Sequence, residues 1–274
     1  MTIWGIAMQT VSFAVAMPIY MAIHLSTSPT VLSDDMSDLY FDVSKLASIP
    51  LSMLIGFIVP AIMLALPSPS VLGFDLKQTF MAVWQVFPIW VGLLQQILPS
   101  IMSICGVTCE HPGDQDYVSD LWIGTARLVY IILLYFAAAI HISTMTLVAA
   151  SKFLPELYKL KHPFNLSMVF IPASLSASTK MSSIGSGALQ LLQYDFLVGS
   201  AAIAIWASTL VMMPKRRVHT IWTWLRQALE FILLTALVGP FGYAISCIWA
   251  RDEFDFERVS ERVLYNASIA DAKM

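Results

Sequence analysis

The chain has 274 residues, of which 58% are hydrophobic and 12% are charged, and its formal net charge is −3. Because a soluble domain carries about 25% charged residues, this composition excludes an ordinary water-soluble fold and makes the lipid bilayer the expected solvent. The small net charge argues against nucleic acid as a partner, and three cysteines are too few for a disulfide framework.

Apolar segments long enough to cross a bilayer recur along the whole chain. A span needs roughly 20 mostly apolar residues, and backbone N–H and C=O groups in lipid must find partners within a helix. The sequence therefore predicts an all-α, polytopic transmembrane helix bundle of about seven spans, with residues 1–250 as the bundle and residues 251–274 as a polar C-terminal tail. In chain order the expected spans are 2–24, 46–66, 79–104, 121–149, a weaker one at 166–183, 187–213 and 223–249. Proline lacks the N–H of the helical hydrogen bond, so we expect kinks at Pro18, Pro60, Pro88 and Pro240.

The distribution of basic residues sets the expected orientation. Positive charge stays on the cytosolic side, and with seven spans the basic groups at 77, 152–161 and 215–217 all lie on the side of the N-terminus. Six spans would separate the last two groups. We therefore expect an integral, multi-pass protein of the endoplasmic reticulum membrane, with a cytosolic N-terminus and no cleaved signal peptide. The tail then lies in the lumen, where Asn266 begins an Asn-Ala-Ser glycosylation sequon.

An acidic segment at 33–42 reads SDDMSDLYFD, with four aspartates at the spacing D-D-x-x-D-x-x-x-D. Two carboxylate clusters with cationic partners could hold magnesium and a diphosphate, and Asp114, Asp116 and Asp120 supply a second acidic group. This interpretation predicts a membrane aromatic prenyltransferase. Basic residues that would bind the phosphates are scarce on that side of the membrane, so we favour an acidic, solvated loop without a metal.

Polar residues inside the expected spans are the main candidates for function, because an ionisable one costs roughly 2.5–3.5 kcal/mol to insert. At about 1.5 Å per residue, Asp195 lies roughly 12 Å below the lumenal end of its helix and Arg127 roughly 9 Å below it. Gln95 and Gln96 lie at a similar depth. Three helices could thus bring a carboxylate, a guanidinium and two amides into one layer. The structural alternative is an Asp195–Arg127 ion pair that ties two helices together.

Glu230 is the other deep carboxylate, roughly 12 Å from the cytosolic end of the last span. Arg226 lies four residues earlier and is expected to pair with it on one helix face. His141 lies nearer the cytosolic side, where a chemical role and a hydrogen bond to a neighbouring helix are both consistent with the sequence. The rings of Trp84 and Trp90 either pack against neighbours or present π faces to a cation.

Four stretches carry a resemblance to a known family: QTVSFAVAMPIYMAIHLSTSP, GFIVPAIMLALPSPS, QYDFLVGSAAIAIWAS and GPFGYAISCIWARDE. They resemble the small integral-membrane terpene cyclases of fungal meroterpenoid clusters, in particular those of the ascochlorin, ascofuranone and macrophorin pathways. The resemblance implies a non-ionising cyclisation, in which a protonated acid opens a terminal epoxide, or protonates a terminal olefin, on a prenylated (farnesyl) aromatic substrate. The carbocation then closes rings and loses a proton, so neither magnesium nor another cofactor is implied.

The resemblance and the helix depths together assign candidate roles. Asp195 lies in a matched stretch and is the first choice for the catalytic acid, with Glu230 second; which carboxylate is the acid and which the base stays open. The residues expected to bind or orient the substrate are Gln95, Gln96, Arg127, Gln190, Gln193, Tyr194, Trp84, Trp90 and His141.

The implied partners follow from the same chemistry. They are a lipophilic prenylated aromatic or epoxyfarnesyl substrate, the lipid bilayer and, in the pathway, a prenyltransferase and a flavin epoxidase, with no nucleic acid. Two alternatives remain: the magnesium-dependent prenyltransferase with its aspartate-rich loop, and a non-catalytic transporter or scaffold.

Overall fold

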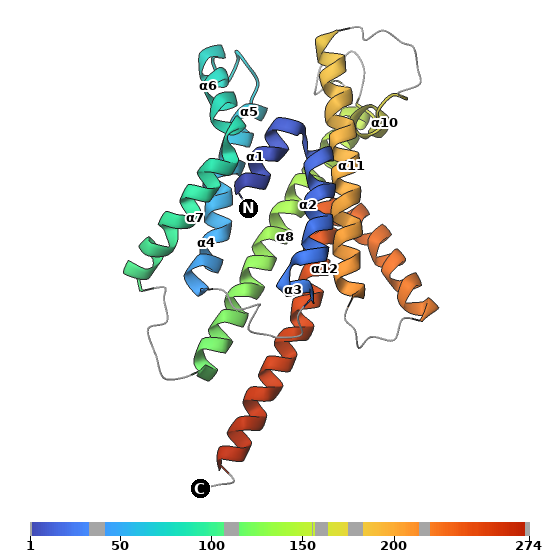
Figure 1. The fold of residues 1–274 in the computed structure, drawn as a ribbon. Coiled ribbons are helices and arrows are strands. Elements are labelled where there is room, and N and C mark those ends of the chain that lie inside the picture. The colour runs from blue at the N-terminus through green and yellow to red at the C-terminus, as the bar shows by residue number, and fades with distance from the viewer. Residues whose placement is uncertain are drawn as a thin grey trace. The chain divides into compact units, whose positions relative to one another are not determined.

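A computed structural model describes residues 2–32, 42–106, 115–154, 156, 164–174, 183–213 and 220–271, with the side chains of all of these except 32, 115–120 and 258–271. Every regular element in these ranges is a helix (Figure 1). The elements are α1 (Thr2–Val11), α2 (Phe13–Thr27), α3 (Pro29–Leu32), α4 (Val43–Met53), the π-helix η2 (Leu54–Ile58), α5 (Val59–Ala65), α6 (Phe74–Gln85), α7 (Phe87–Ile104), α8 (Gln115–Phe153), α10 (Leu166–Phe170), α11 (Ile184–Met212) and α12 (Ile221–Asp271).

Among the described residues, five helical segments are long and apolar enough to cross a membrane. They are Val43–Ala65, Phe87–Ile104, Leu121–Phe153, Ile184–Met212 and Ile221–Glu257, and a shorter apolar helix covers Phe13–Thr27. These segments confirm the all-α, polytopic fold class and the helices expected at 46–66, 121–149, 187–213 and 223–249.

The span expected at 2–24 is two helices rather than one. α1 ends at Val11 and α2 begins at Phe13, and Ser12 between them has a φ of 89°. A positive φ is uncommon for a residue with a Cβ atom, so this break places strain in the backbone. It also creates a helix N-terminus inside an apolar segment, and the first N–H groups of that helix need acceptors from elsewhere.

The span expected at 79–104 is also interrupted. α6 and α7 separate at Val86, because Pro88 in the first turn of α7 has no N–H with which to continue the preceding helix. The indole Nε1 of Trp90 donates to the Val83 carbonyl at 3.0 Å, and this bond satisfies a carbonyl near the end of α6.

The weaker span expected at 166–183 is wrong as a continuous helix. α10 ends at Phe170, and residues 171–174 are not helical. Pro172 disfavours a helical conformation in the residue before it, and Ile171 is accordingly extended, with φ −103° and ψ 109°. One of the seven expected helical spans is therefore not a continuous helix, and the orientation that rested on seven spans stays a prediction.

The chain divides into two compact units, which we describe separately. Unit 1 comprises Met1–Thr10, Ser28–Leu133 and Trp249–Met274, and unit 2 comprises Val11–Thr27 and Leu134–Ile248. The helices α8 and α12 each contribute one part to unit 1 and another part to unit 2.

In unit 1, α4 and α7 lie side by side (Figure 1). Ser44, Ser48 and Ser52 recur every four residues along α4 and are all buried, as is typical of helix contacts in membranes, where small residues let two backbones approach. Gln95 of α7 donates to the Ser52 hydroxyl, and Ser48 lies 3.4 Å from the Gln95 amide oxygen. The amide thus ties α7 to the serine face of α4.

The C-terminal part of α12 packs on α8 in the same unit. Trp122, Ile123 and Ala126 of α8 are buried together with Phe256 of α12, and the rings of Trp122 and Phe256 meet edge to face at 5.1 Å. α12 runs through residue 250 as a helix. The boundary expected there therefore lies inside a helix, and a separate tail stays a prediction.

In unit 2, α2 and α11 lie side by side (Figure 1). Gly199 of α11 permits this approach, since a Cβ atom at that position would lie 2.0 Å from the ring of Phe13. Further along the pair, the indole Nε1 of Trp206 donates to Nδ1 of His24 at 3.2 Å. Unit 2 therefore depends on glycine at one contact and on a polar bond at another.

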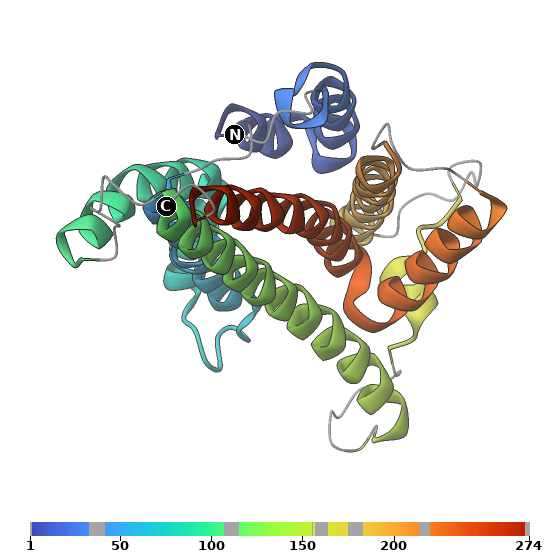
Figure 2. The same ribbon diagram turned by 90° about the horizontal axis from the view of Figure 1, so that it is seen from below.

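α12 bends sharply within unit 2, and its parts before and after Gly239 run in different directions (Figure 2). Gly239 has φ 81° and ψ 171°, and Pro240 follows it, so the kink expected at this proline is confirmed. On either side of the bend, Gln227 Nε2 donates to the Tyr243 hydroxyl at 2.7 Å, and that hydroxyl lies 2.6 Å from Ser208 Oγ of α11.

Candidate active site

Asp195 of α11 lies against the start of α2. Its Oδ1 accepts the N–H of Ala14 at 2.7 Å, and its Oδ2 accepts the N–H of Phe13 at 3.4 Å. These are the first two N–H groups of α2, which have no acceptor within their own helix. Because the break at Ser12 leaves them in an apolar segment, the carboxyl group of the neighbouring helix supplies the acceptors that the break requires.

Four phenylalanine rings contact one another in unit 2, and two of them belong to residues next to or bonded to Asp195. Phe13 donates its N–H to Asp195, and Phe196 is the residue that follows Asp195 in the chain. The ring of Phe241 in α12 lies 6.2 Å from the ring of Phe13 and 6.3 Å from the ring of Phe196. Phe170 of α10 lies 5.8 Å from Phe196. We call these four phenylalanines the ring cluster. Phe196 and Phe241 are 36% and 39% exposed, so protein atoms do not cover either residue completely.

Glu230 has a different environment. Its Oε1 accepts a hydrogen bond from Nε of Arg226 at 2.7 Å, and the ion pair expected from the sequence is thereby confirmed. The side chains of Arg226 and Glu230 are 82% and 40% exposed. Glu230 therefore has a counter-ion on its own helix face.

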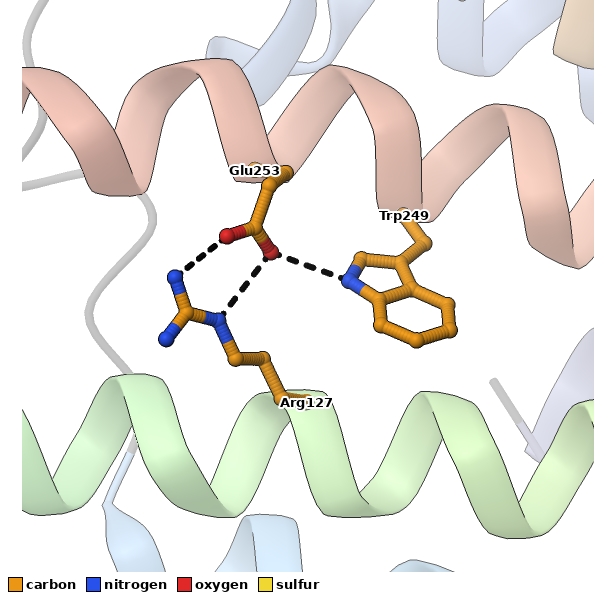
Figure 3. Close-up of polar contacts among 3 residues, drawn as sticks. All are labelled: Arg127, Trp249 and Glu253. Atoms are coloured by element: carbon orange, nitrogen blue, oxygen red, sulfur yellow. Dashed lines mark hydrogen bonds and ion pairs between the residues drawn. The ribbon is translucent and has the colours of Figure 1, made fainter.

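Arg127 of α8 binds Glu253 of α12 in unit 1 (Figure 3). Its Nε donates to Oε2 at 3.1 Å, and its Nη2 donates to Oε1. The indole Nε1 of Trp249 donates to the same Oε2 at 3.0 Å. Each of the two groups considered for an Asp195–Arg127 ion pair thus has partners within its own unit, Glu253 for the guanidinium and backbone N–H groups for Asp195.

A buried carboxylate accompanies this pair. Asp252 accepts a hydrogen bond from the Tyr130 hydroxyl at 2.5 Å and another from Nε of Arg251 at 2.7 Å. The rings of Tyr130 and Trp249 stack with their centroids 6.1 Å apart. The segment after residue 250 therefore contributes charged groups to the interface between α8 and α12.

Asp252 and Glu253 were missed because the residues after 250 were assigned to a polar tail, and Trp249, the last residue of the expected span 223–249, was given no role. A signal was present: Trp249, Glu253 and Phe256 recur at intervals of four and three residues, which is the spacing of one helix face. That face extends the apolar stripe beyond the point where the charge content rises.

Gln193 binds backbone carbonyls instead of facing an open site. Its side chain is buried, and its Nε2 lies 2.8 Å from the Met168 carbonyl and 3.2 Å from the Val169 carbonyl. Both carbonyls belong to the short helix α10, whose last carbonyls have no intrahelical partner. Gln193 thus replaces the hydrogen bonds that a continued helix would have supplied.

Gln190 and Tyr194 act on the same segment. Gln190 Nε2 and the Tyr194 hydroxyl both donate to the Ala173 carbonyl, at 3.0 Å and 2.7 Å. Ala173 follows Pro172 in the non-helical stretch, where the backbone has no regular partners. These contacts give both residues a structural role, and a role in orienting a substrate oxygen stays a prediction.

The remaining candidates lie in unit 1, apart from His141. Gln95 is bound to the serines of α4, and Gln96 beside it is exposed. Trp84 packs with Phe57 and Phe87, with ring centroids 6.5 Å and 6.1 Å away. Trp90 bonds the backbone at the interruption between α6 and α7.

His141 of α8 and Asn266 complete the expected set. The Nε2 of His141 lies 3.1 Å from the Ala236 carbonyl of α12, so the hydrogen bond to a neighbouring helix is present. Asn266 lies in the part of α12 whose side chains are outside the described residues, and its glycosylation stays a prediction.

Residues 33–41 of the aspartate-rich segment lie outside the described residues. In the second acidic group, Asp114 and the side chains of Asp116 and Asp120 also lie outside them. Asp42 is described and caps α4, accepting the N–H and the hydroxyl of Ser44 at 2.8 Å and 2.5 Å. The hydrogen bond from the Ser44 hydroxyl lowers the pKa of Asp42 below its ordinary value. Within the described ranges, no three His, Cys, Asp or Glu side chains are grouped so that they could hold a metal ion.

These contacts define a polytopic α-helical membrane protein in which one carboxyl group lies at a helix break beside phenylalanine rings. The chain belongs to the CtvD domain family, which matches residues 1–256. No solved structure matches the chain.

Three relatives of this chain are each named a terpene cyclase. The chain is 26% identical to "Terpene cyclase ascI" of Acremonium egyptiacum over 95% of this chain and 64% of that protein. It is 26% identical to "Terpene cyclase verU1" of Penicillium polonicum, covering 89% and 61% of the two chains, and 24% identical to "Terpene cyclase ctvD" of Aspergillus terreus, covering 92% and 67%. This chain thus spans between 61% and 67% of the length of these relatives.

Proposed function

We propose that this protein is a membrane-bound terpene cyclase that protonates an epoxide or olefin on a prenylated, farnesyl-bearing aromatic compound and cyclises the resulting carbocation. The observation that carries the proposal is the CtvD family match, together with relatives that are named terpene cyclases. The same observation favours a cyclase over the magnesium-dependent prenyltransferase.

Asp195 is the catalytic acid in this proposal. Its two oxygens accept hydrogen bonds of different length: Oδ1 is 2.7 Å from the Ala14 nitrogen, and Oδ2 is 3.4 Å from the Phe13 nitrogen. Oδ2 is therefore the oxygen that can carry and release a proton. As that proton leaves, the N–H on Oδ1 and the partial positive charge at the start of α2 stabilise the carboxylate that remains.

The reaction balances without a cofactor. The proton passes from Asp195 to the epoxide oxygen, the terminal C–O bond breaks, and a neighbouring double bond supplies the electron pair of each new C–C bond. Loss of a proton from the last carbocation to a base restores the acid–base balance, so the net change is an isomerisation. The faces of Phe196 and Phe241 attract the moving positive charge, a contribution of about 2 kcal/mol or more per contact in a dry site.

The setting follows from this chemistry. A farnesyl-bearing substrate partitions into lipid, and we place the enzyme in the endoplasmic reticulum with its N-terminus in the cytosol, Asn266 glycosylated in the lumen and the residues after 250 as its C-terminal tail. A prenyltransferase and a flavin epoxidase must act before this enzyme, because the first attaches the farnesyl chain and the second forms the epoxide.

The test uses microsomes that contain the full chain and a synthetic phenol bearing a terminally epoxidised farnesyl chain, with and without EDTA. We expect cyclised isomers of unchanged mass in both conditions. For Asp195→Asn we expect the rate to fall about 100-fold or more, because a positioned acid typically contributes that much. Asparagine keeps an oxygen for the Ala14 N–H but has no carboxyl proton, so the folded fraction, measured by size exclusion in detergent, should change little.

Two results would contradict the proposal. Product formation that disappears in EDTA would favour the magnesium-dependent prenyltransferase. An Asp195→Asn variant with full activity would remove Asp195 as the acid.

A further inference from the structure

The kink of α12 leaves one carbonyl group in need of a donor. In a helix the residue at position 240 would donate its N–H to the carbonyl of residue 236, but Pro240 has no N–H. Ala236 therefore has a carbonyl without its helical partner in a segment of membrane-spanning length. An unsatisfied carbonyl in lipid is costly, so a side chain from another helix is the expected donor.

His141 of α8 supplies that donor. Its Nε2 lies 3.1 Å from the Ala236 carbonyl oxygen, and because a carbonyl only accepts, Nε2 must carry the hydrogen. The imidazole also lies against Gly239, where an added Cβ atom would be 2.9 Å from Nδ1 and 3.0 Å from Cγ. Gly239 therefore meets two requirements at once, a φ of 81° and direct contact with the imidazole ring.

The kink sets the position of one member of the ring cluster, Phe241. Phe241 lies two residues after Gly239, and its ring is 6.2 Å from Phe13 and 6.3 Å from Phe196. Phe13 is also the residue whose N–H contacts Asp195 Oδ2. A change in the bend at Gly239 would move Phe241 relative to both rings, while Asp195 would keep its own contacts to α2.

We propose that His141 is a positioning residue, which holds the α12 kink through the Ala236 carbonyl and so fixes Phe241 in the ring cluster, where that ring determines how far cyclisation proceeds before the carbocation is quenched. The inference rests on the proposed function. It assigns His141 no proton transfer and no contact with substrate.

Two substitutions separate this role from acid–base chemistry. In His141→Gln the amide Nε2 lies near the place of the imidazole Nε2 and can still donate to Ala236, whereas in His141→Asn the shorter amide cannot reach it. Both remove the imidazole. The assay uses the epoxyfarnesyl phenol in microsomes, with rates normalised to folded protein and products resolved by chromatography and mass.

We expect His141→Gln to retain the product pattern within twofold of the native chain. His141→Asn should shift product at least fivefold toward partly cyclised and water-quenched compounds, and Phe241→Leu should give the same shift. The double variant His141→Asn/Phe241→Leu should shift product no further than either single change, because both act on one ring.

Several outcomes would overturn the inference. Equal loss of activity in both His141 variants with an unchanged product pattern would indicate a proton-transfer role instead. A lower folded fraction in His141→Asn with a native product pattern would reduce His141 to a stability residue. If the native chain forms no cyclised product, the proposed function fails and this inference with it, which is distinct from a native chain that cyclises while His141→Asn leaves the pattern unchanged.

Discussion

Asp195 and Glu253 are both carboxylates in segments of membrane-spanning length, but they have opposite kinds of partner. Asp195 accepts two backbone N–H groups from the start of α2. Glu253 accepts two hydrogen bonds from the guanidinium of Arg127 and one from the indole of Trp249 (Figure 3). One carboxyl group is held by neutral donors and the other is neutralised by a full positive charge.

The difference bears on the proposal that Asp195 is the catalytic acid. A full positive charge stabilises the ionised form strongly, and the charged pair then ties two helices together. Backbone N–H donors orient the Asp195 carboxyl group without supplying a counter-ion, so no ion pair has to be broken when this group acts as the proposed acid. Glu253, Asp252 and Glu230 all have an arginine partner, whereas Asp195 is held by backbone N–H groups.

The first prediction concerns the packing that holds Asp195 in place. Gly199→Ala would put a Cβ atom 2.0 Å from the ring of Phe13, a rigid group whose backbone N–H contacts Asp195. We expect a loss of about 1–3 kcal/mol in stability, as for other overpacked sites, and a fall in cyclisation of about 10-fold or more. Heating the detergent-solubilised protein in steps and measuring the fraction that remains monodisperse checks the first expectation, and the microsomal assay checks the second.

A control on the same helix is available. Gly185 of α11 has only the Ser183 hydroxyl near its added Cβ, at 3.8 Å, so Gly185→Ala should change neither quantity. Equal behaviour of the two glycine variants would mean that the contact between α2 and α11 does not position Asp195.

The second prediction tests the other side of the comparison. Arg127→Met keeps an apolar side chain of similar length but removes the counter-ion of Glu253. Because the two side chains are 46% and 31% exposed, we expect a moderate loss of roughly 1 kcal/mol rather than the larger cost of a sealed pair. The product pattern should stay native, since the pair serves unit 1.

The double variant Arg127→Met/Glu253→Gln sharpens this test. Removing the orphaned charge should recover part of the lost stability, and the two changes should therefore be non-additive. Additive losses would show that the two side chains act independently, and a changed product pattern would give the pair a role in the reaction.

The success and failure of sequence reasoning differ between these two regions. Asp195 could be predicted because a lone carboxylate in an apolar helix stands out against its neighbours. Its partners could not, because the break at Ser12 lies in a stretch without proline or glycine, and a positive φ at serine follows from tertiary contacts rather than from local preference. The carboxyl group accepts the N–H groups that the helix break leaves without partners. The sequence shows the carboxyl group, but it does not show the break.

Arg127 shows the converse case. Its depth in the helix was predictable, and an ion pair with Asp195 was one alternative for it. Glu253 was not considered as a partner, because the residues after 250 were expected to form a polar tail. Glu253 and Asp252 lie where α12 still packs on α8, and composition averaged over a segment hides the helix face that each residue occupies. In the same way, the apolar stretch at 166–183 met the composition of a span although Pro172 ends the helix.

The smallest expected effect belongs to Glu230, and it separates the two candidate acids. Arg226 and Glu230 form an ion pair one helical turn apart, and a glutamine at position 230 keeps an oxygen that can accept from the Arg226 Nε. Glu230→Gln should therefore leave the thermal profile and the cyclisation rate within twofold of the native chain. If Glu230→Gln lost as much activity as Asp195→Asn, then the counter-ion would not disqualify a carboxylate from proton transfer. The contrast between neutral and charged partners would then no longer identify the acid in this chain.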